Sequence, residues 1–258
     1  MKTNVILKKL FILLFISFTS VSLMAQMRGN GHVISKTFDL SAFNEISVGG
    51  SFEVTLTQST EQKVVITVDE NLMDRIEVKV VGGELQLSTR MMQNPTKLHA
   101  EISVPSLTSI DASGATSVKT TNKFTGSAFE VEVSGASEVN FTGDFTKLNI
   151  ELTGASELNF TGLINTMTAE ISGASEGNYK GDCETIEVDL SGSSDLILTG
   201  KGKMLNAEIS GASGLKAVDF EVVNASVEAS GASEAALNVT GTLDGEESGA
   251  SDIHNIRH

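Results

Sequence analysis

The sequence predicts an all-β chain that folds as a right-handed parallel β-helix, a solenoid with coils of about 19 residues. Two observations predict this class: a glycine motif recurs at a nearly constant interval, and apolar and polar residues alternate on both sides of it. The glycines are Gly114, Gly135, Gly154, Gly173, Gly192, Gly211, Gly231 and Gly249, at intervals of 21, 19, 19, 19, 19, 20 and 18 residues. A fixed period of this length is typical of repeats that bury their apolar faces against one another.

The alternation around each glycine indicates short strands. Before Gly135 the chain reads Val-Glu-Val at 131–133, and after it Val-Asn-Phe at 139–141. A period of two places the polar residue outward and its apolar neighbours inward. Thr142-Gly143 then signals a turn. Two or three such strands with a glycine corner make one β-helix coil, whereas a helical repeat would need longer periodic segments and fewer glycines.

The residues of the corner are small, as stacking requires. Coils lie about 4.8 Å apart, so a bulky side chain at a sharp bend would collide with its copy in the next coil. Glycine also tolerates positive φ. We expect hydroxyl ladders on both sides of the corner and one apolar row inside the coils. The expected rows are Ser134, Thr153, Ser172, Ser191 and Ser210; Ser137, Ser156 and Ser175; and Phe141, Phe160, Tyr179, Leu198 and Ala217.

The ends of the solenoid are predicted to differ from its middle. Residues 111–251 form the regular coils, and residues 26–110 form a wider N-terminal β segment with a first, divergent coil at Gly50. The strands expected there read EVTLTQ, KVVITV, IEVKVV, ELQLST and HAEISV. Glu246-Glu247 precedes the last corner, where earlier coils carry an apolar core residue, and such polar substitution caps a terminal repeat. Residues 252–258 are expected to form a C-terminal tail.

Residues 1–25 have the features of a secretory signal peptide: three lysines, an apolar run over 10–18, and a small residue at Ala25. A helix needs about 20 apolar residues to cross a bilayer, and the run over 10–18 is shorter than this. No second apolar run of that length follows, so we expect no transmembrane segment in the mature chain. Cleavage after Ala25 would remove three lysines and no acidic residues, which changes the formal charge from −15 to −18. A chain this acidic should repel nucleic acid and attract cations or basic partners. We expect export to the periplasm or the cell surface.

Four stretches together resemble a known family. They read FNEISVGGSFEVTLTQ, VDENLMDRIEVKVVGGELQLS, ISVPSLTSIDASGA and the trailing Gly-Ala-Ser coils. From about residue 38 to residue 251, the sequence resembles the putative auto-transporter adhesins of the head GIN domain family, exported proteins of Bacteroidetes-type bacteria. The resemblance implies a right-handed parallel β-helix and a surface or periplasmic role.

Acidic residues flank the corners in two rows. Row A, three residues before each glycine, comprises Asp111, Glu132, Glu151, Glu170, Asp189, Glu208, Glu228 and Glu246. Row B, three residues after it, comprises Glu138, Glu157, Glu176, Asp195, Glu234 and Asp252, interrupted by Ser117 and Gly214. Solvation of outward positions, together with protection against edge-to-edge association, accounts for both rows. The alternative is weak, multi-site association of Ca²⁺. Neighbouring charges repel by only roughly 0.9 kcal/mol in water, so repulsion does not demand a metal. No other cofactor is expected.

Catalysis finds little support in the repeat. Residues 112–251 contain no histidine and no arginine, so the repeated serines lack the base that a nucleophile needs. Carboxylates abound, and the alternative of a carbohydrate-active β-helix enzyme acting on a neutral glycan therefore stays open. The coils at Gly211 and Gly231 break the pattern with Lys216, Asp219 and Glu221, which form a second candidate binding site.

These observations predict an exported, non-catalytic protein of the cell envelope or surface, an adhesin-like binding or structural module. Its expected partner is a protein or glycan of the envelope or extracellular space. A homo-oligomer also stays open, because an exposed flank could pair with a second chain. The single cysteine, Cys183, cannot form an internal disulfide, and we expect it to pack beside a turn.

Overall fold

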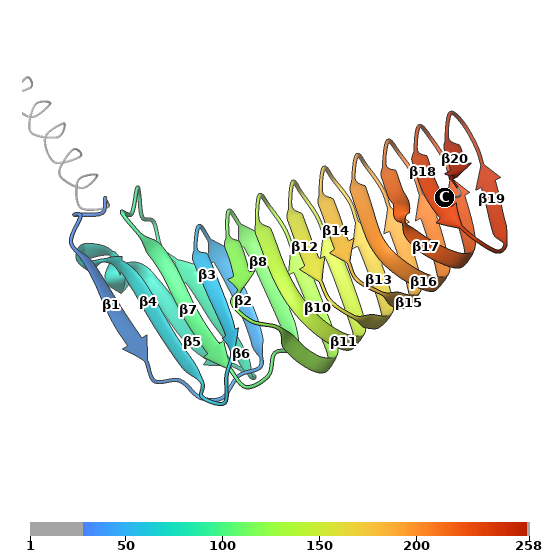
Figure 1. Cartoon of the computed structure of the whole chain (residues 1–258). Helices are drawn as coiled ribbons and strands as arrows, with labels where there is room; N and C mark the ends of the chain where they lie inside the picture. The colour runs from blue at the N-terminus through green and yellow to red at the C-terminus, as the bar shows by residue number, and fades with distance from the viewer. Residues whose placement is uncertain (1–27, 257–258) are drawn as a thin grey trace, which may run out of the picture.

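The computed structural model of the protein describes residues 28–256; the expected signal peptide, residues 1–25, lies outside this range. The chain forms an elongated parallel β-helix of about eight turns, along which the sequence runs from one end to the other (Figure 1). The predicted all-β class and the coil length of about 19 residues are confirmed.

Each regular coil contributes strands to two faces that meet at the glycine corner. The strands of these coils are β8 (Ser109–Gly114), β9 (Ser117–Thr120), β10 (Phe124–Val133), β11 (Glu138–Leu152), β12 (Glu157–Thr161), β13 (Ile164–Ile171), β14 (Glu176–Lys180), β15 (Cys183–Leu190), β16 (Asp195–Ile209), β17 (Gly214–Ala229), β18 (Glu234–Val239), β19 (Leu243–Glu247) and β20 (Asp252–Asn255). Neighbouring coils pair in parallel and in register, so Phe141, Phe160 and Tyr179 stack directly. The expected interior row is confirmed, and Leu198 and Ala217 continue it as buried residues.

The N-terminal segment departs from simple sequential stacking. Strands β2 (Glu45–Gly50) and β3 (Glu53–Gln58) form a coil whose Gly50 lies in register with Gly114. Before β8 joins this coil, the chain makes an excursion through β4 (Lys63–Asp69), η1 (Glu70–Arg75), β5 (Ile76–Val81), β6 (Glu84–Thr89) and β7 (Leu98–Val104). Strands β6 and β7 pair in parallel with the far edges of β2 and β3, so the coil between them is covered on both sides.

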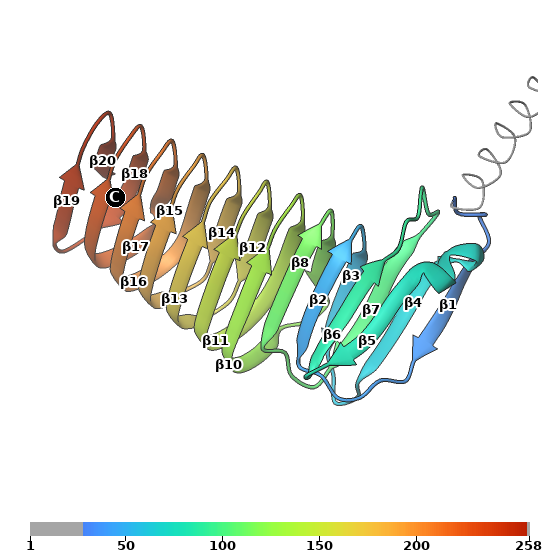
Figure 2. The ribbon, with the colours of Figure 1, turned by 180° about the vertical axis from the view of Figure 1, so that it is seen from behind.

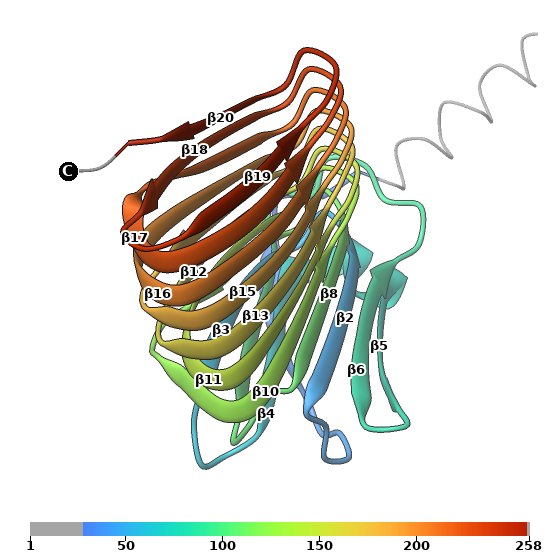
Figure 3. The ribbon, with the colours of Figure 1, turned by 90° about the vertical axis from the view of Figure 1, so that its right-hand side faces the viewer.

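Antiparallel strands close this end of the solenoid. Strand β5 pairs with β6, β4 pairs with β7, and β1 (Val33–Phe38) pairs with β4, all antiparallel. Buried Leu72 and Met73 of η1 lie between β4 and β5 in the chain and belong to the common core. The end view in Figure 3 shows the contrast at the other end, where the last coil carries no such strands.

The corner geometry explains the recurring Gly-Ala-Ser. Gly135 has φ +74°, and a Cβ on it would lie 2.6 Å from the carbonyl oxygen of Gly114. Ala136 N–H donates to that oxygen at 2.7 Å, which holds the coils this close. The serine that follows turns inward: Ser137, Ser156 and Ser175 are buried, and the hydroxyls of Ser156 and Ser175 lie 3.2 Å apart. The ladder expected for this second serine row is therefore present between these two coils.

The first serine row bonds differently. Ser210 Oγ donates to the carbonyl of Leu190 at 3.4 Å, across the coil boundary, and Ser230 Oγ donates to that of Ile209 at 3.5 Å. These hydroxyls lie half-buried at the outer side of the corner. The link between coils here runs from hydroxyl to backbone, whereas the sequence predicted a ladder of hydroxyls.

The last coil is polar, as predicted, but the expected tail is partly folded. Residues 252–255 form β20, which pairs in parallel with β18. Glu247 stands opposite Ala229 in the register and is exposed, and its Oε1 accepts the N–H of Ile253 at 2.6 Å. The carboxylate thus joins β19 to β20 across the end of the coil, which gives the terminal acid a direct capping contact.

Candidate functional site

Row A forms a continuous line of carboxylates on the long-strand face. Its eight members stand opposite one another in the registers of β8, β10, β11, β13, β15, β16, β17 and β19. Figure 2 shows these strands running side by side along the molecule. The outward side chains follow from the strand period, because the residues on each side of the first seven row A members, from Asp111 to Glu228, are buried in the core.

The carboxylates of row A carry charge without a cationic partner. Within residues 28–256, no Lys, Arg or His nitrogen lies within 4.0 Å of a row A carboxylate. Burial raises the pKa of the Glu132 carboxyl, and the charges of Glu151, Asp111 and Glu130 raise it further. Ser47 donates one hydrogen bond to Asp111 at 3.0 Å, at the N-terminal end of the row. The row is therefore a band of mutually repelling charge.

A shallow hollow follows row A over the C-terminal coils. Its volume is about 330 Å³. The lining includes four row A carboxylates and three corner hydroxyls, namely Asp189, Glu208, Glu228 and Glu246 with Ser210, Ser230 and Ser248. Carboxylates and hydroxyls here face one concave surface, which suits a cationic group better than an anionic one.

Row B has the same register but a different chemistry. Glu138, Glu157, Glu176 and Asp195 stack in line on β11, β12, β14 and β16. An asparagine two residues on donates to each of the three glutamates, at 2.6, 2.8 and 2.9 Å, from Asn140, Asn159 and Asn178 respectively. Asp195 instead pairs with Lys216 at 3.3 Å. These four row B carboxylates thus have partners on their own chain that the row A carboxylates lack, a difference that the spacing Glu-x-Asn on an outward face could have indicated.

The pattern break is a bulge with local ion pairs. The register between β16 and β17 shifts between Ile197 and Gly200, and that between β17 and β18 shifts between Ala217 and Glu221. The extra length turns Phe220 inward, where its ring lies 2.7 Å from the place a Cβ on Gly202 would take. Lys216, which lies before the shift and opposite Ile197, pairs with Asp195 of row B. Glu221 lies 3.6 Å from Lys201, and Asp219 stays exposed. The three residues do not converge on one point.

The described residues lack a cluster of metal-ligating side chains. Among residues 28–256, no three His, Cys, Asp or Glu side chains cluster as metal ligands would. Cys183 is buried, and burial raises the pKa of its thiol to about 12, so the thiolate is scarce at neutral pH. His254 Nε2 lies 2.9 Å from Asp252, an exposed pair on β20.

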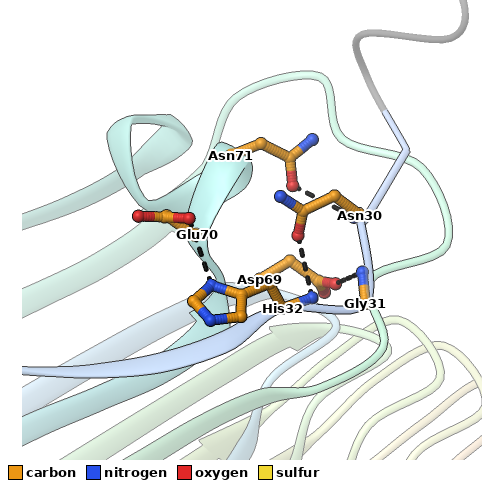
Figure 4. A network of polar contacts seen from close by, with 6 residues as sticks. All are labelled: Asn30, Gly31, His32, Asp69, Glu70 and Asn71. Carbon is orange, nitrogen blue, oxygen red and sulfur yellow. Dashed lines mark hydrogen bonds and ion pairs between the residues drawn. The ribbon is translucent and has the colours of Figure 1, made fainter.

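A polar network at the N-terminal end was not foreseen from the sequence. The buried Asp69 carboxylate accepts the N–H of Gly31 at 2.7 Å and both the N–H and the hydroxyl of Thr96, at 2.6 and 2.8 Å. Beside it, Asn71 accepts the N–H of Asn30, and His32 lies 3.1 Å from Glu70 (Figure 4). The network ties residues 30–32 onto the closed end of the solenoid, so it anchors structure there.

The comparison with family models settles the relationship that the motifs suggested. The model described as "Putative auto-transporter adhesin, head GIN domain" matches residues 42–181 and again residues 170–257. The chain belongs to this family. The second match begins within the regular coils and includes none of the N-terminal segment. No curated protein matches the chain.

Solved structures share the fold at low identity. A putative adhesin from Parabacteroides merdae superposes with a TM-score of 0.67 at 17% identity, covering 89% of this chain and 98% of that one. A putative adhesin from Parabacteroides distasonis gives 0.63 at 19%, covering 90% and 97%. A further structure from that species, described as a putative lipid binding protein, gives 0.60 at 19%, covering 89% and 99%. At this identity the likeness shows the fold alone.

No helix among residues 28–256 has the length and apolar character needed to cross a bilayer.

Proposed function

We propose that the chain is an exported, non-catalytic binding module of the cell envelope or surface, and that row A is its contact surface for a basic protein partner. The observation that carries this proposal is the contrast between the two rows. Four row B carboxylates, those of Glu138, Glu157, Glu176 and Asp195, have asparagine or lysine partners on the same chain. Row A carboxylates stand in line with no cationic partner within residues 28–256.

The electrostatics favour a basic partner on this face. Aligned carboxylates about 4.8 Å apart repel one another, and a cationic segment would relieve that repulsion along the whole line. Charge complementarity of this kind chiefly speeds association and sets specificity, and it weakens as salt screens the field. The adhesin description of the family agrees with a binding role in general.

Two triple variants with equal loss of charge test the proposal. Glu151→Gln/Glu170→Gln/Asp189→Asn neutralises the centre of row A. Glu138→Gln/Glu157→Gln/Glu176→Gln neutralises the centre of row B and serves as the matched control. The probe is a fluorescently labelled oligolysine peptide, and the measurement is its fluorescence anisotropy at two salt concentrations.

We expect the row A variant to weaken binding at least tenfold and the row B variant to weaken it less than threefold. Equal weakening by both variants would show that net charge alone attracts the peptide. Absence of measurable binding by the wild-type chain at low salt would refute the proposal altogether.

Weak, multi-site Ca²⁺ association along row A is a second candidate, supported by the same unpaired carboxylates. A Ca²⁺ titration followed by thermal unfolding tests it, because an ion that binds the folded chain raises Tm. No shift at millimolar Ca²⁺ contradicts it.

The enzyme alternative has its own assay. Hydrolysis of a neutral glycan would require a carboxylate pair around a sugar-binding cleft, and the hollow on the row A face is lined by carboxylates. Release of reducing sugar from a panel of neutral glycans would overturn the non-catalytic assignment.

A further inference from the structure

Four strands among residues 28–256 pair with a neighbouring strand on one side only: β1, β5, β19 and β20. An unpaired strand edge is a template for pairing with another chain, and proteins commonly protect such an edge with a charged or polar side chain that points inward. Three of these four edges carry such a side chain, and β5 does not.

Polar side chains occupy an inward position on β1, β19 and β20. They stand opposite buried apolar residues of the neighbouring strand: Lys36 opposite Ile66, Glu247 opposite Ala229, and Asn255 opposite Leu237. A second chain stacked on any of these edges would have to cover a charge or an amide, which is unfavourable without a new partner for it. These three edges therefore resist pairing.

The inward side of β5 is apolar instead. Ile76, Val78 and Val80 pack against the core but are only partly buried, and β5 pairs with β6 alone. The outward side of the strand carries Glu77 and Lys79. Figure 3 shows β5 as the outermost strand on its flank of the molecule. Its free edge is thus open to a second chain.

The turn after β5 shows which backbone groups are free. Gly82 and Gly83 both have positive φ, +66° and +94°, and form a two-residue hairpin turn between β5 and β6. The residues that flank such a turn exchange hydrogen bonds, and bonded and non-bonded pairs then alternate along the two strands. The N–H and C=O groups of Val78 and Val80 therefore point away from β6, toward the free edge.

We propose that the free edge of β5 pairs antiparallel with the same edge of a second copy of this chain, in a twofold dimer centred on Val78. In this register Val78 N–H donates to the carbonyl of the partner's Val78, and the twofold axis repeats the bond. Val80 N–H likewise donates to the carbonyl of the partner's Ile76.

The charges on the outward side fix the register. Glu77 stands opposite the partner's Lys79, and Lys79 opposite the partner's Glu77, so both cross-strand pairs join opposite charges. A shift of two residues in one direction would place Lys79 opposite the partner's Lys79, and a shift in the other direction would place Glu77 opposite the partner's Glu77. Like charges directly opposite destabilise a strand pair. The sequence of β5 is therefore complementary to itself in one register.

The dimer would also cover the apolar side of β5. Ile76, Val78 and Val80 of each copy would lie beside those of the other, which removes apolar surface from water. Glu77 Oε1 contacts Arg90 of its own chain, and a carboxylate has a second oxygen for the partner's Lys79. An edge of six residues buries less area than a standard interface, so we expect the dimer to dissociate on dilution.

The outward line through Lys79 leads to row A. Lys79 stands opposite Gln86, and Gln86 stands opposite Ser47. Ser47 stands opposite Asp111, the first member of row A. A twofold axis perpendicular to this sheet puts row A of both copies on one face, where two linked sites would bind a repetitive partner with greater avidity. This consequence rests on the function proposed for row A, whereas the dimer itself does not.

Charge variants test the surface and its register. Glu77→Lys puts two lysines on the outward side of β5 and Lys79→Glu puts two glutamates there, so each variant places like charges across the twofold axis. We expect each variant to weaken the dimer by about tenfold, measured by sedimentation velocity over a dilution series of the mature chain. An equimolar mixture of the two variants should recover the wild-type affinity as a heterodimer. Lys180→Glu, at an exposed position on β14, is the control for net charge and should leave the affinity unchanged.

Val78→Pro tests the backbone pairing. Proline is tolerated on an edge strand where the N–H faces solvent, so the β5–β6 hairpin and the Tm of the monomer should be preserved while the dimer is lost. A wild-type chain that stays monomeric up to its solubility limit would overturn the proposal. A dimer that the charge variants leave intact would show that another surface forms it, and a mixture that stays as weak as its components would overturn the register.

Discussion

The corner glycines meet the strictest steric requirement in the solenoid, and Gly173→Ala tests it. Gly173 has φ +79° and lies in the middle of the regular coils. A Cβ on it would lie 2.5 Å from the carbonyl oxygen and 3.0 Å from the nitrogen of Gly154. Ala174 N–H donates to that same oxygen at 2.8 Å, so the two coils cannot move apart without weakening this bond.

Two contributions set the expected size of the effect. A positive φ costs a residue with a Cβ about 1–2 kcal/mol. Loss of one backbone hydrogen bond adds about 1 kcal/mol. We therefore expect Gly173→Ala to lower the free energy of unfolding by about 2–3 kcal/mol, which for a chain of this size lowers Tm by roughly 4–12 °C.

Thermal unfolding followed by circular dichroism measures the change, with two controls. Gly82→Ala has the dihedral cost alone, because Gly82 has φ +66° and no atom lies within 4 Å of its would-be Cβ. Ala174→Ser introduces the residue that Ser193 already provides in the next corner, and it should change stability by less than about 0.5 kcal/mol. The stacking explanation fails if Gly173→Ala is no more destabilising than Gly82→Ala.

Four further outcomes follow from individual side chains. Glu132→Gln should stabilise the chain by about 0.5 kcal/mol near neutral pH, because the raised pKa of Glu132 means that its ionised form opposes folding above the usual carboxyl range. Urea unfolding at pH 7 measures this change. Burial raises the pKa of Asp69, but hydrogen bonds from Thr96 and Gly31 outweigh burial, so the net pKa is lowered. Asp69 therefore stabilises the fold above about pH 4, and this stabilisation is lost as the pH falls. Asp69→Asn should lower the free energy of unfolding by about 1–3 kcal/mol at pH 7, measured by urea unfolding. Burial, with Lys97, lowers the pKa of His99, so the unfolded chain takes up the proton first and stability should fall below about pH 6.5. Tm should therefore decrease from pH 7 to pH 5, and His99→Gln should make this decrease smaller. Phe220→Ala should cost about 3–5 kcal/mol in urea unfolding, because removal of this buried ring leaves a cavity beside Gly202.

The translational repeat explains why the regular coils could be predicted. Because equivalent positions in the regular coils share one environment, the sequence repeats the evidence for each position. The roles of Gly135 and Phe160 are therefore visible from the equivalent residues of the other coils. Row A was predicted as a line for the same reason. The strand segments of the N-terminal excursion also came from local alternation, and β3, β5 and β6 have the bounds that the sequence suggested.

The stacking order at the N-terminal end could not be predicted in this way. Gly50 and Gly114 are in register although 64 residues separate them, and alternation does not say which edge β6 and β7 will occupy. Pairing between distant strands depends on competition among edges in the folded chain. The inward turn of Phe220 was missed because it depends on the packing of neighbouring coils, whereas the asparagine partners of row B lie two residues away on the same strand and the Glu-x-Asn spacing could have indicated them.

The contact of row A with a basic partner is the central claim, and zero-length cross-linking tests it most directly. A carbodiimide joins a lysine ammonium to a carboxylate only where the two touch, and mass spectrometry then locates the link. With the oligolysine probe bound, we predict links at Glu151, Glu170 and Asp189 that exceed those at Glu138, Glu157 and Glu176. Links spread evenly over both rows, or concentrated on row B, would contradict the account.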